Sequence, residues 1–235
     1  MKQFHVVPMV ITLLLLVGIV AGKFILPRFS GQLVHAQSSQ SSADPNCVAF
    51  TTPVLMRKAN GKGFYNLQVT SNKCYATYSQ AIFAATGGKV KLPANMKPGE
   101  AAHKLINAIY NSGSSPNLTG YPFIELFQNS NYGGQNLLYS SSSEVCTAGN
   151  TWGSWQIGTN SNNFNMNDQT SSFQVFGNCE AVLLYQNANA NGFSFAGSVY
   201  SSPSGDVALV AGVMNDQASS FEIADTCSDL SNCNG

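Results

Sequence analysis

The residues with the clearest chemical potential form one short motif that occurs twice. The first copy, MNDQTSSF, occupies residues 166–173, and the second, MNDQASSF, occupies residues 214–221. The copies are identical at seven of their eight positions and lie about 48 residues apart, which indicates an internal repeat. Asn, Asp, Ser and Thr oxygens and backbone carbonyls are hard ligands that suit Ca²⁺. A single copy is typical of a polar turn, but two copies favour a metal site.

The composition argues against several classes of protein. Charged residues make up 9% of the 235 residues, and the formal net charge is zero. Neither a basic surface for nucleic acid nor an acidic tail is therefore expected. The hydrophobic content of 44% is ordinary for a globular protein and argues against general disorder.

The N-terminal residues have the features of a targeting segment. Lys2 precedes an almost wholly apolar run over residues 6–20, and residues 34–36 have the small-residue pattern of a cleavage site. We expect residues 1–36 to be a signal peptide or, because the apolar run ends well before that pattern, an uncleaved membrane anchor. Residues 37–45 are expected to be a polar linker. The rest of the protein is then secreted or extracytoplasmic, with membrane contact only through this segment.

Six cysteines agree with export, because disulfides persist in oxidising compartments. None lies in a CxxC motif, which argues against a zinc or thioredoxin-type site. Many pairings are possible. Proximity in the sequence favours three of them and leaves the others open: Cys47 with Cys74, Cys146 with Cys179, and Cys227 with Cys233.

Residues 46–115 are expected to form a small α+β module of unknown role. The spacing of apolar residues predicts two helices, and short apolar runs predict two strands. The predicted helices cover residues 75–86 and 98–110, and the predicted strands cover residues 64–69 and 89–92. His103 has no neighbouring cysteine and is predicted to lie on the surface of the second helix.

Residues 121–225 are predicted to be all-β. Eight short apolar runs alternate with turns rich in Asn, Gly and Ser, as in an antiparallel sandwich or barrel. The runs cover residues 123–127, 136–139, 155–157, 173–176, 182–185, 193–195, 207–210 and 221–223. The internal repeat divides them into two sets of four, which suits paired Greek keys.

Two motifs in this region resemble those of the βγ-crystallin superfamily. Residues 127–134, FQNSNYGG, match the aromatic-x4-aromatic-x-Gly signature of its hairpin, in which Gly134 permits a backbone conformation that a Cβ disfavours. The doubled NDxxSS sequence is similar to the calcium motif of the microbial members. In the second repeat, Ala190 stands in place of the second aromatic residue. The resemblance implies an all-β, double Greek-key sandwich within residues 116–235, preceded by the small module.

The resemblance also implies two reciprocal calcium sites. The first site is expected to use the backbone carbonyls of Gln128 and Gln169, the hydroxyl of Ser171 and the carboxylate of Asp216. The second is expected to use the carbonyls of Gln186 and Gln217, the hydroxyl of Ser219 and the carboxylate of Asp168. The residues expected to brace the loops are Asn167, Asn215, Ser172 and Ser220. With one carboxylate per site, the expected dissociation constants are roughly 10⁻⁵ to 10⁻³ M.

These observations predict an exported, non-catalytic protein that calcium ions stabilise. Residues 121–225 contain no His, Lys or Arg, and two of their few acidic residues are expected to be calcium ligands, so an enzyme is not predicted. The alternative is a module that binds a glycan or a cell-surface ligand, because Trp152 and Trp155 could stack on sugar rings. Core packing is the competing interpretation for both tryptophans.

Overall fold

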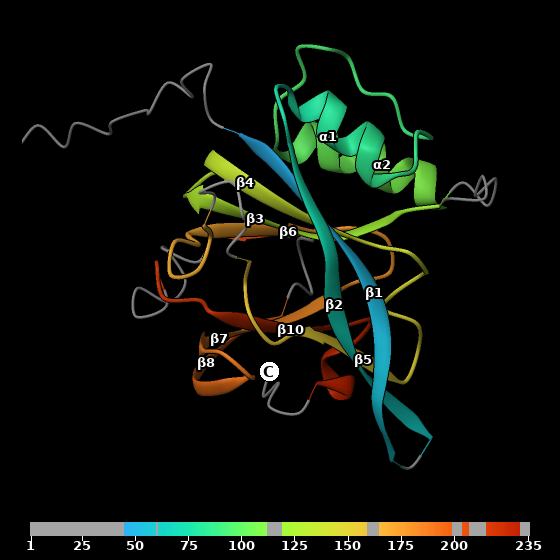
Figure 1. Ribbon diagram of the computed structural model, residues 1–235, viewed down its shortest axis with the longest axis vertical. Coiled ribbons are helices and arrows are strands. Elements are labelled where there is room, and N and C mark those ends of the chain that lie inside the picture. Colours follow the sequence, from blue (N-terminus) through green and yellow to red (C-terminus); the bar gives the residue numbers. More distant parts are fainter. Residues whose placement is uncertain are drawn as a thin grey trace, which may run out of the picture. The chain divides into compact units, whose positions relative to one another are not determined.

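The computed structural model describes residues 45–59, 61–111, 119–158, 165–198, 204–206 and 215–230, within one compact unit of residues 38–235 (Figure 1). The strands and helices are β1 (Asn46–Ala59), β2 (Lys62–Tyr75), α1 (Tyr78–Ala85), α2 (Glu100–Asn111), β3 (Tyr121–Asn129), β4 (Gly133–Ser141), β5 (Asn150–Ser154), β6 (Ser172–Val175), β7 (Ala181–Asn187), β8 (Asn191–Ser198), β9 (Ser204–Asp206), β10 (Ser220–Ala224) and a short 3₁₀ helix η1 (Cys227–Asp229). The predicted leader over residues 1–36, almost all of the linker over residues 37–45 and the strand over residues 207–210 lie outside the described residues.

The two repeats exchange strands. The first repeat supplies β3 to β6, and the second supplies β7 to β10. However, β5 pairs with β10, and β9 pairs with β6. Each repeat therefore contributes its third strand to the layer built by the other, which gives the predicted double Greek-key arrangement. Buried aromatic side chains between the layers, among them Phe123, Tyr139 and Phe221, form the central core.

The hairpin of β1 and β2 joins the two layers. β1 pairs with β4 in parallel, and β2 pairs with β5 in parallel, so the sheet order is β8-β7-β10-β5-β2-β1-β4-β3-β6-β9. Figure 1 shows both strands running alongside the upper and the lower layer. The boundary expected between residues 46–115 and residues 116–235 does not coincide with a break in the sheet, because the first strands of the chain lie in its middle.

Both helices cover the outer face of the sheet near β1 and β4. Thr77 caps the start of α1, because its hydroxyl accepts a hydrogen bond from the Gln80 amide. Gly87, with φ of +62°, follows the residue that caps the other end, Thr86. Residues 89–92 do not form the predicted strand. They have no strand partner, and Val90 and Leu92 instead pack into the apolar cluster beneath the helices.

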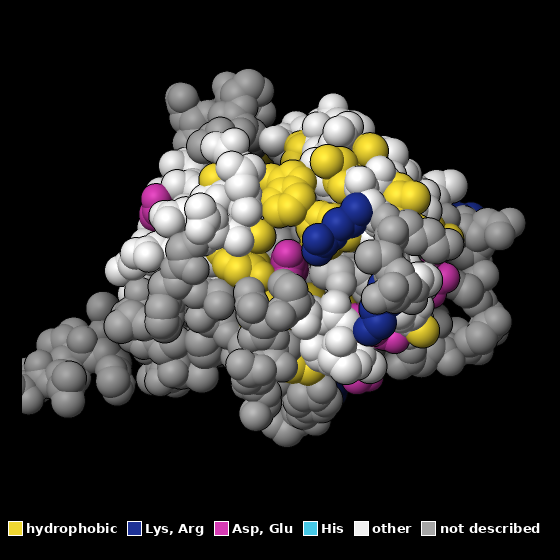
Figure 2. Space-filling view, turned by 90° about the horizontal axis from the view of Figure 1, so that it is seen from below, with side chains coloured by type: hydrophobic (Ala, Val, Ile, Leu, Met, Phe, Trp, Pro, Cys, Tyr) yellow, Lys and Arg dark blue, Asp and Glu magenta, His cyan; other side chains and the backbone are white. Residues whose placement is uncertain are grey.

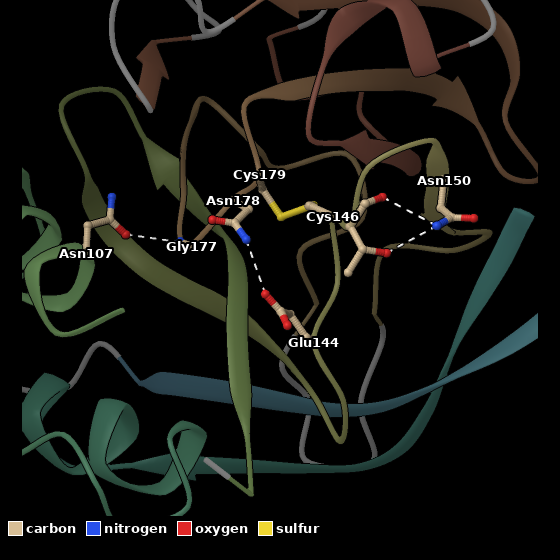
Figure 3. The surroundings of a disulfide bond; sticks show 8 residues. Asn107, Glu144, Cys146, Asn150, Gly177, Asn178 and Cys179 are labelled. Carbon is tan, nitrogen blue, oxygen red and sulfur yellow. Dashed lines mark hydrogen bonds between the residues drawn. A yellow bond between two sulfur atoms is a disulfide. The ribbon is translucent and has the colours of Figure 1, made fainter. Parts of the chain in front are cut away.

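The prediction that His103 lies on the surface is wrong. Its side chain is 5% exposed, because this face of α2 packs against the end of β6. The Nε2 atom lies 2.6 Å from the carbonyl oxygen of Val175. One turn further along α2, the side-chain oxygen of Asn107 accepts a hydrogen bond from the Gly177 backbone amide (Figure 3). These contacts attach the helix to the first repeat.

Two of the three predicted disulfides are present. Cys47 and Cys74 lie directly opposite each other in the β1–β2 pair. Cys146 and Cys179 join the segment after β4 to the segment after β6 (Figure 3). The third predicted pair includes Cys233, which lies outside the described residues. No helix within the described residues is long and apolar enough to span a membrane.

Candidate metal centre

The two copies of the doubled motif adopt the same backbone conformation. Asp168 and Asp216 have φ values of 56° and 55°, in the left-handed region that Asp tolerates better than most residues. The side-chain amide of the preceding asparagine donates to Oδ2 of each aspartate, at 2.7 Å from Asn167 and at 2.9 Å from Asn215. These bonds orient the carboxylates and leave Oδ1 of each directed to the other motif.

The contacts between the motifs are reciprocal. The Ser171 hydroxyl donates to Oδ1 of Asp216, and the Ser219 hydroxyl donates to Oδ1 of Asp168, both at 2.9 Å. The backbone hydrogen bonds have the same symmetry. The Asp168 amide donates to the Ala218 carbonyl, and the Asp216 amide donates to the Thr170 carbonyl. In each hydroxyl–carboxylate pair expected from the sequence, a serine of one repeat therefore lies beside an aspartate of the other repeat.

Each motif is also attached to the first strand of its own repeat. The Ser171 amide donates to the Phe127 carbonyl at 2.9 Å, and the Ser219 amide donates to the Tyr185 carbonyl at 2.8 Å. The next residue of each strand, Gln128 or Gln186, falls at a shift in the strand register. Such a bulge takes a residue out of the regular ladder, so both glutamines lie beside their motif in equivalent positions.

The glutamines of strand and motif also meet through their side chains. Gln128 donates its side-chain amide to the Gln169 oxygen at 3.2 Å, and Gln186 donates to the Gln217 oxygen at 2.8 Å. Gln135 adds a further donor to Gln169. All eight predicted ligand residues therefore lie in two groups, each of which combines one strand and both motifs.

The last serine of each motif fixes the hairpin. The Ser172 hydroxyl donates to the Asn129 carbonyl at 2.7 Å and accepts from the Tyr132 amide. The Ser220 hydroxyl donates to the Asn187 carbonyl at 2.6 Å and accepts from the Ala190 amide. The second hairpin thus keeps the same hydrogen bonds even though it lacks the aromatic residue.

The hairpin aromatic of the first repeat and its replacement in the second are both packed. Tyr132 contacts Phe127 edge to face, with ring centroids 5.4 Å apart. Ala190 packs instead on the small apolar cluster that contains Tyr185. Gly134, at the start of β4, has φ of +73°, and a Cβ there would meet the Asn129 side chain at 2.8 Å. The predicted need for glycine at this position is confirmed.

The donor chemistry of the two groups fits a calcium ion. Each group offers one carboxylate, one hydroxyl and peptide carbonyls, which are hard oxygen ligands, and no sulfur or imidazole. Asp168 and Asp216 are exposed to solvent, while Ser171 and Ser219 are buried beside them. Within the described residues, no three His, Cys, Asp or Glu side chains form a cluster that could hold a metal ion. A site rich in carboxylates is therefore not found in that part of the chain.

The two copies differ at one buried position. Thr170 of the first copy is fully buried, and its hydroxyl has no hydrogen-bond partner among the described residues. Ala218 occupies the equivalent place in the second copy. The backbone carbonyl of each of these residues accepts the bond from the opposite aspartate amide, so the side-chain difference leaves the connection between the motifs intact.

One buried acidic residue of the first repeat was not predicted from the sequence. Glu125 on β3 is completely buried, and its carboxyl group accepts hydrogen bonds from Tyr78, Asn136 and Gln174. Burial raises the pKa of Glu125 to about 8, against the lowering effect of the hydrogen bonds from Gln174 and Tyr78. Its only signal in the sequence is one acidic residue within the apolar run Phe-Ile-Glu-Leu-Phe.

The tryptophans have different environments. Trp152 is buried in the core and stacks on Tyr65, with ring centroids 5.5 Å apart. It cannot serve as the exposed sugar platform considered from the sequence. Trp155 is partly exposed, and one part of its ring packs against Phe64 at 5.1 Å between centroids.

No protein-family model matches the chain, and no curated protein matches it either. Among solved structures, the chain is similar to a βγ-crystallin domain from Clostridium beijerinckii, at 21% identity over 44% of this chain and 99% of that chain, with a TM-score of 0.30. A domain from Flavobacterium johnsoniae is similar at 21% identity over 43% and 92%, and an archaeal βγ-crystallin at 20% over 43% and 95%, both with a TM-score of 0.28.

Proposed function

We propose that the protein binds two calcium ions at the reciprocal groups and that calcium stabilises its double Greek-key fold. The observation that carries this proposal is the crossed pairing of Ser171 with Asp216 and of Ser219 with Asp168. A cation at each pair would interact with a carboxylate of one repeat and a hydroxyl of the other. Each ion would therefore connect the two repeats.

The expected effect is structural. A ligand that binds only the folded state adds about 2.7 kcal/mol to the free energy of unfolding at about 100 times its dissociation constant. With one carboxylate per site, the affinity falls in the range of extracellular modules rather than of cytosolic buffers. Sites of that affinity are filled for most of the time outside the cell and do not need to respond to rapid changes.

The proposal includes export and the absence of catalysis. The disulfides Cys47–Cys74 and Cys146–Cys179 suit an oxidising compartment. In this proposal the only carboxylates of the two groups, those of Asp168 and Asp216, bind calcium instead of transferring protons. The role that follows is that of a calcium-stabilised extracellular scaffold.

Calorimetric titration of the full chain with calcium, together with thermal melts in calcium and in chelator, tests this proposal. We expect two bound ions, a higher melting temperature in calcium, and loss of both effects in the double variant Asp168→Asn/Asp216→Asn. The matched control is Glu180→Gln, which removes an exposed carboxylate of the same domain outside the motifs. Unchanged binding in the double variant, or no binding by the wild-type protein, would overturn the proposal.

A further inference from the structure

A hollow beside Trp155 is the most distinctive surface feature outside the metal centre. The chain from Ser154 to Gly158 forms one wall, and β2 forms the other. The side chains that line it are Asn66, Leu67, Val69, Asn72, Ser154, Trp155 and Gln156. We call this hollow the Trp155 groove.

The groove exists because β5 is much shorter than its neighbour. β5 pairs with β2 only over residues 63–66, whereas β2 continues to Tyr75. Beyond Ser154 the chain leaves the sheet, and this side of β2 has no strand partner within the described residues. The edge of β2 beyond Asn66 is therefore open to the groove, and the side chain of Trp155 lies at one end of this edge.

Among the described residues, the side chains that line the groove are all uncharged. It combines one partly exposed indole with the amides of Asn66, Asn72 and Gln156 and with apolar atoms of Leu67 and Val69. These amides place hydrogen-bond donors and acceptors beside the indole.

The lining distinguishes this groove from the other polar hollow near β2. That second hollow contains Arg57, Lys62, Glu222 and Asp229, and its ion pair between Lys62 and Asp229 already satisfies two of these charges. The face of the molecule drawn in Figure 2 carries few charged side chains, and some of them lie next to exposed hydrophobic side chains. A neutral ligand is therefore matched by the Trp155 groove and not by the charged hollow.

We propose that the Trp155 groove binds a neutral carbohydrate. A sugar ring has an apolar C–H face that can lie on an indole, and its hydroxyl groups both donate and accept hydrogen bonds, as the amides around the groove require. An apolar platform with a few convergent polar groups is the usual composition of a small-molecule site. Trp155 acts as the platform, and Asn66, Asn72 and Gln156 select for hydroxyl groups.

The groove is attached directly to the second candidate calcium site. The Ile157 amide donates to the Ser219 carbonyl at 2.7 Å, and the Asn189 amide donates to the Trp155 carbonyl at 2.8 Å. Ser219 also supplies the hydroxyl paired with Asp168. If the proposed function is right, calcium at this site holds the backbone of Trp155 and Ile157 in place, and carbohydrate binding becomes stronger in calcium.

The test is calorimetric titration of the full chain with short, soluble, neutral oligosaccharides of glucan, mannan, xylan and chitin. We expect at least one of them to bind, with a change in tryptophan fluorescence, and Trp155→Ala to weaken binding by about tenfold. Gln156→Ala, which changes an exposed side chain, provides a second variant if Trp155→Ala does not fold. The matched control is Phe83→Ala, since Phe83 is an exposed aromatic residue on α1.

The outcomes separate the two proposals. No binding by any of these oligosaccharides, or binding that is unchanged in both Trp155→Ala and Gln156→Ala, would overturn the carbohydrate site. Binding that is equal in calcium and in chelator would retain the carbohydrate site and overturn its connection to the metal. Failure of calcium titration, with oligosaccharide binding intact, would overturn the proposed function alone.

Discussion

At the scale of single residues, Asp168 and Asp216 each lie in one copy of the motif and contact the serine of the other copy. Asp168 lies beside Ser219, and Asp216 lies beside Ser171. A repeated motif in the sequence reveals the residue types but not which copies meet. The pairing of copies follows from the exchange of β5 and β9 between the layers, which places the two motifs next to each other.

The crossed pairing predicts which ion each substitution removes. Asp216→Asn should abolish the site built on Gln128, Gln169 and Ser171, and it should leave the other site in place. Calorimetric titration should then show one bound calcium ion instead of two. Ser171→Ala should affect the same ion, because it removes the hydroxyl partner of Asp216. Loss of both ions from either variant, or retention of two, would contradict the assignment of ligands to the two sites.

Glu125 provides a prediction about pH. Burial raises its pKa to about 8, whereas an unfolded chain has a glutamate pKa of about 4.3. Between these values the folded state holds a proton that the unfolded state lacks, so the free energy of unfolding falls as the pH rises. The contribution is fully present below about pH 4 and is lost above about pH 8, with a slope of up to about 1.4 kcal/mol per pH unit.

Denaturant unfolding of wild type and Glu125→Gln at a series of pH values measures this effect. The variant keeps a neutral group of similar size beside Tyr78 and Gln174 and should lose the decrease in stability across this pH range. Glu180→Gln, at an exposed position, should keep it. A wild-type profile that rises from pH 5 to pH 8, or an unchanged profile in Glu125→Gln, would show that Glu125 is not protonated in the folded state.

At the scale of elements, the strands of residues 121–225 were largely predictable because their apolar runs are short and separated by turns. β5 departs from the prediction, because it covers Asn150–Ser154 rather than the apolar run over residues 155–157. β9, Ser204–Asp206, also lies outside the predicted runs. β1 was not predicted at all. Its sequence contains Pro53 and two adjacent threonines, and its parallel partner β4 is distant in the chain. Only the assembled sheet shows why this stretch is extended.

The two helices were predicted from spacing, and their packing gives a matched pair of substitutions. Ile106 of α2 is fully buried in the apolar cluster between the helices and the sheet, whereas its neighbour Leu105 is 38% exposed. Ile106→Ala should reduce the free energy of unfolding by about 2–5 kcal/mol, because it leaves a cavity in a closed core. Leu105→Ala should change it by less than about 0.5 kcal/mol. Equal effects in denaturant unfolding would mean that α2 is not packed by this face.

At the scale of the whole molecule, the division of the chain was the least predictable feature. The change in composition near residue 115 suggests two modules, and the repeat explains only the second of them. Sequence patterns describe what each strand buries, not which edge it pairs with. β1 and β2 satisfy the edges of β4 and β5, and this pairing involves residues too far apart in the chain for a local pattern to reveal.

The central position of β1 and β2 predicts that residues 116–235 are not a complete folding unit. Without the hairpin, β4 and β5 lose a strand partner each, and the core loses Cys47, Ala49 and Leu67, which are buried between the layers. Unpaired edges favour association between chains. A chain that starts at residue 116 should therefore melt roughly ten degrees or more below a chain that starts at residue 38, and it should elute as larger species in size-exclusion chromatography. Adding calcium should raise both melting temperatures but should not close the gap between them, because the metal centre joins the motifs and not the exposed edges. A monomeric fragment with the melting temperature of the longer chain would show that the hairpin is an accessory to an independent double Greek-key domain.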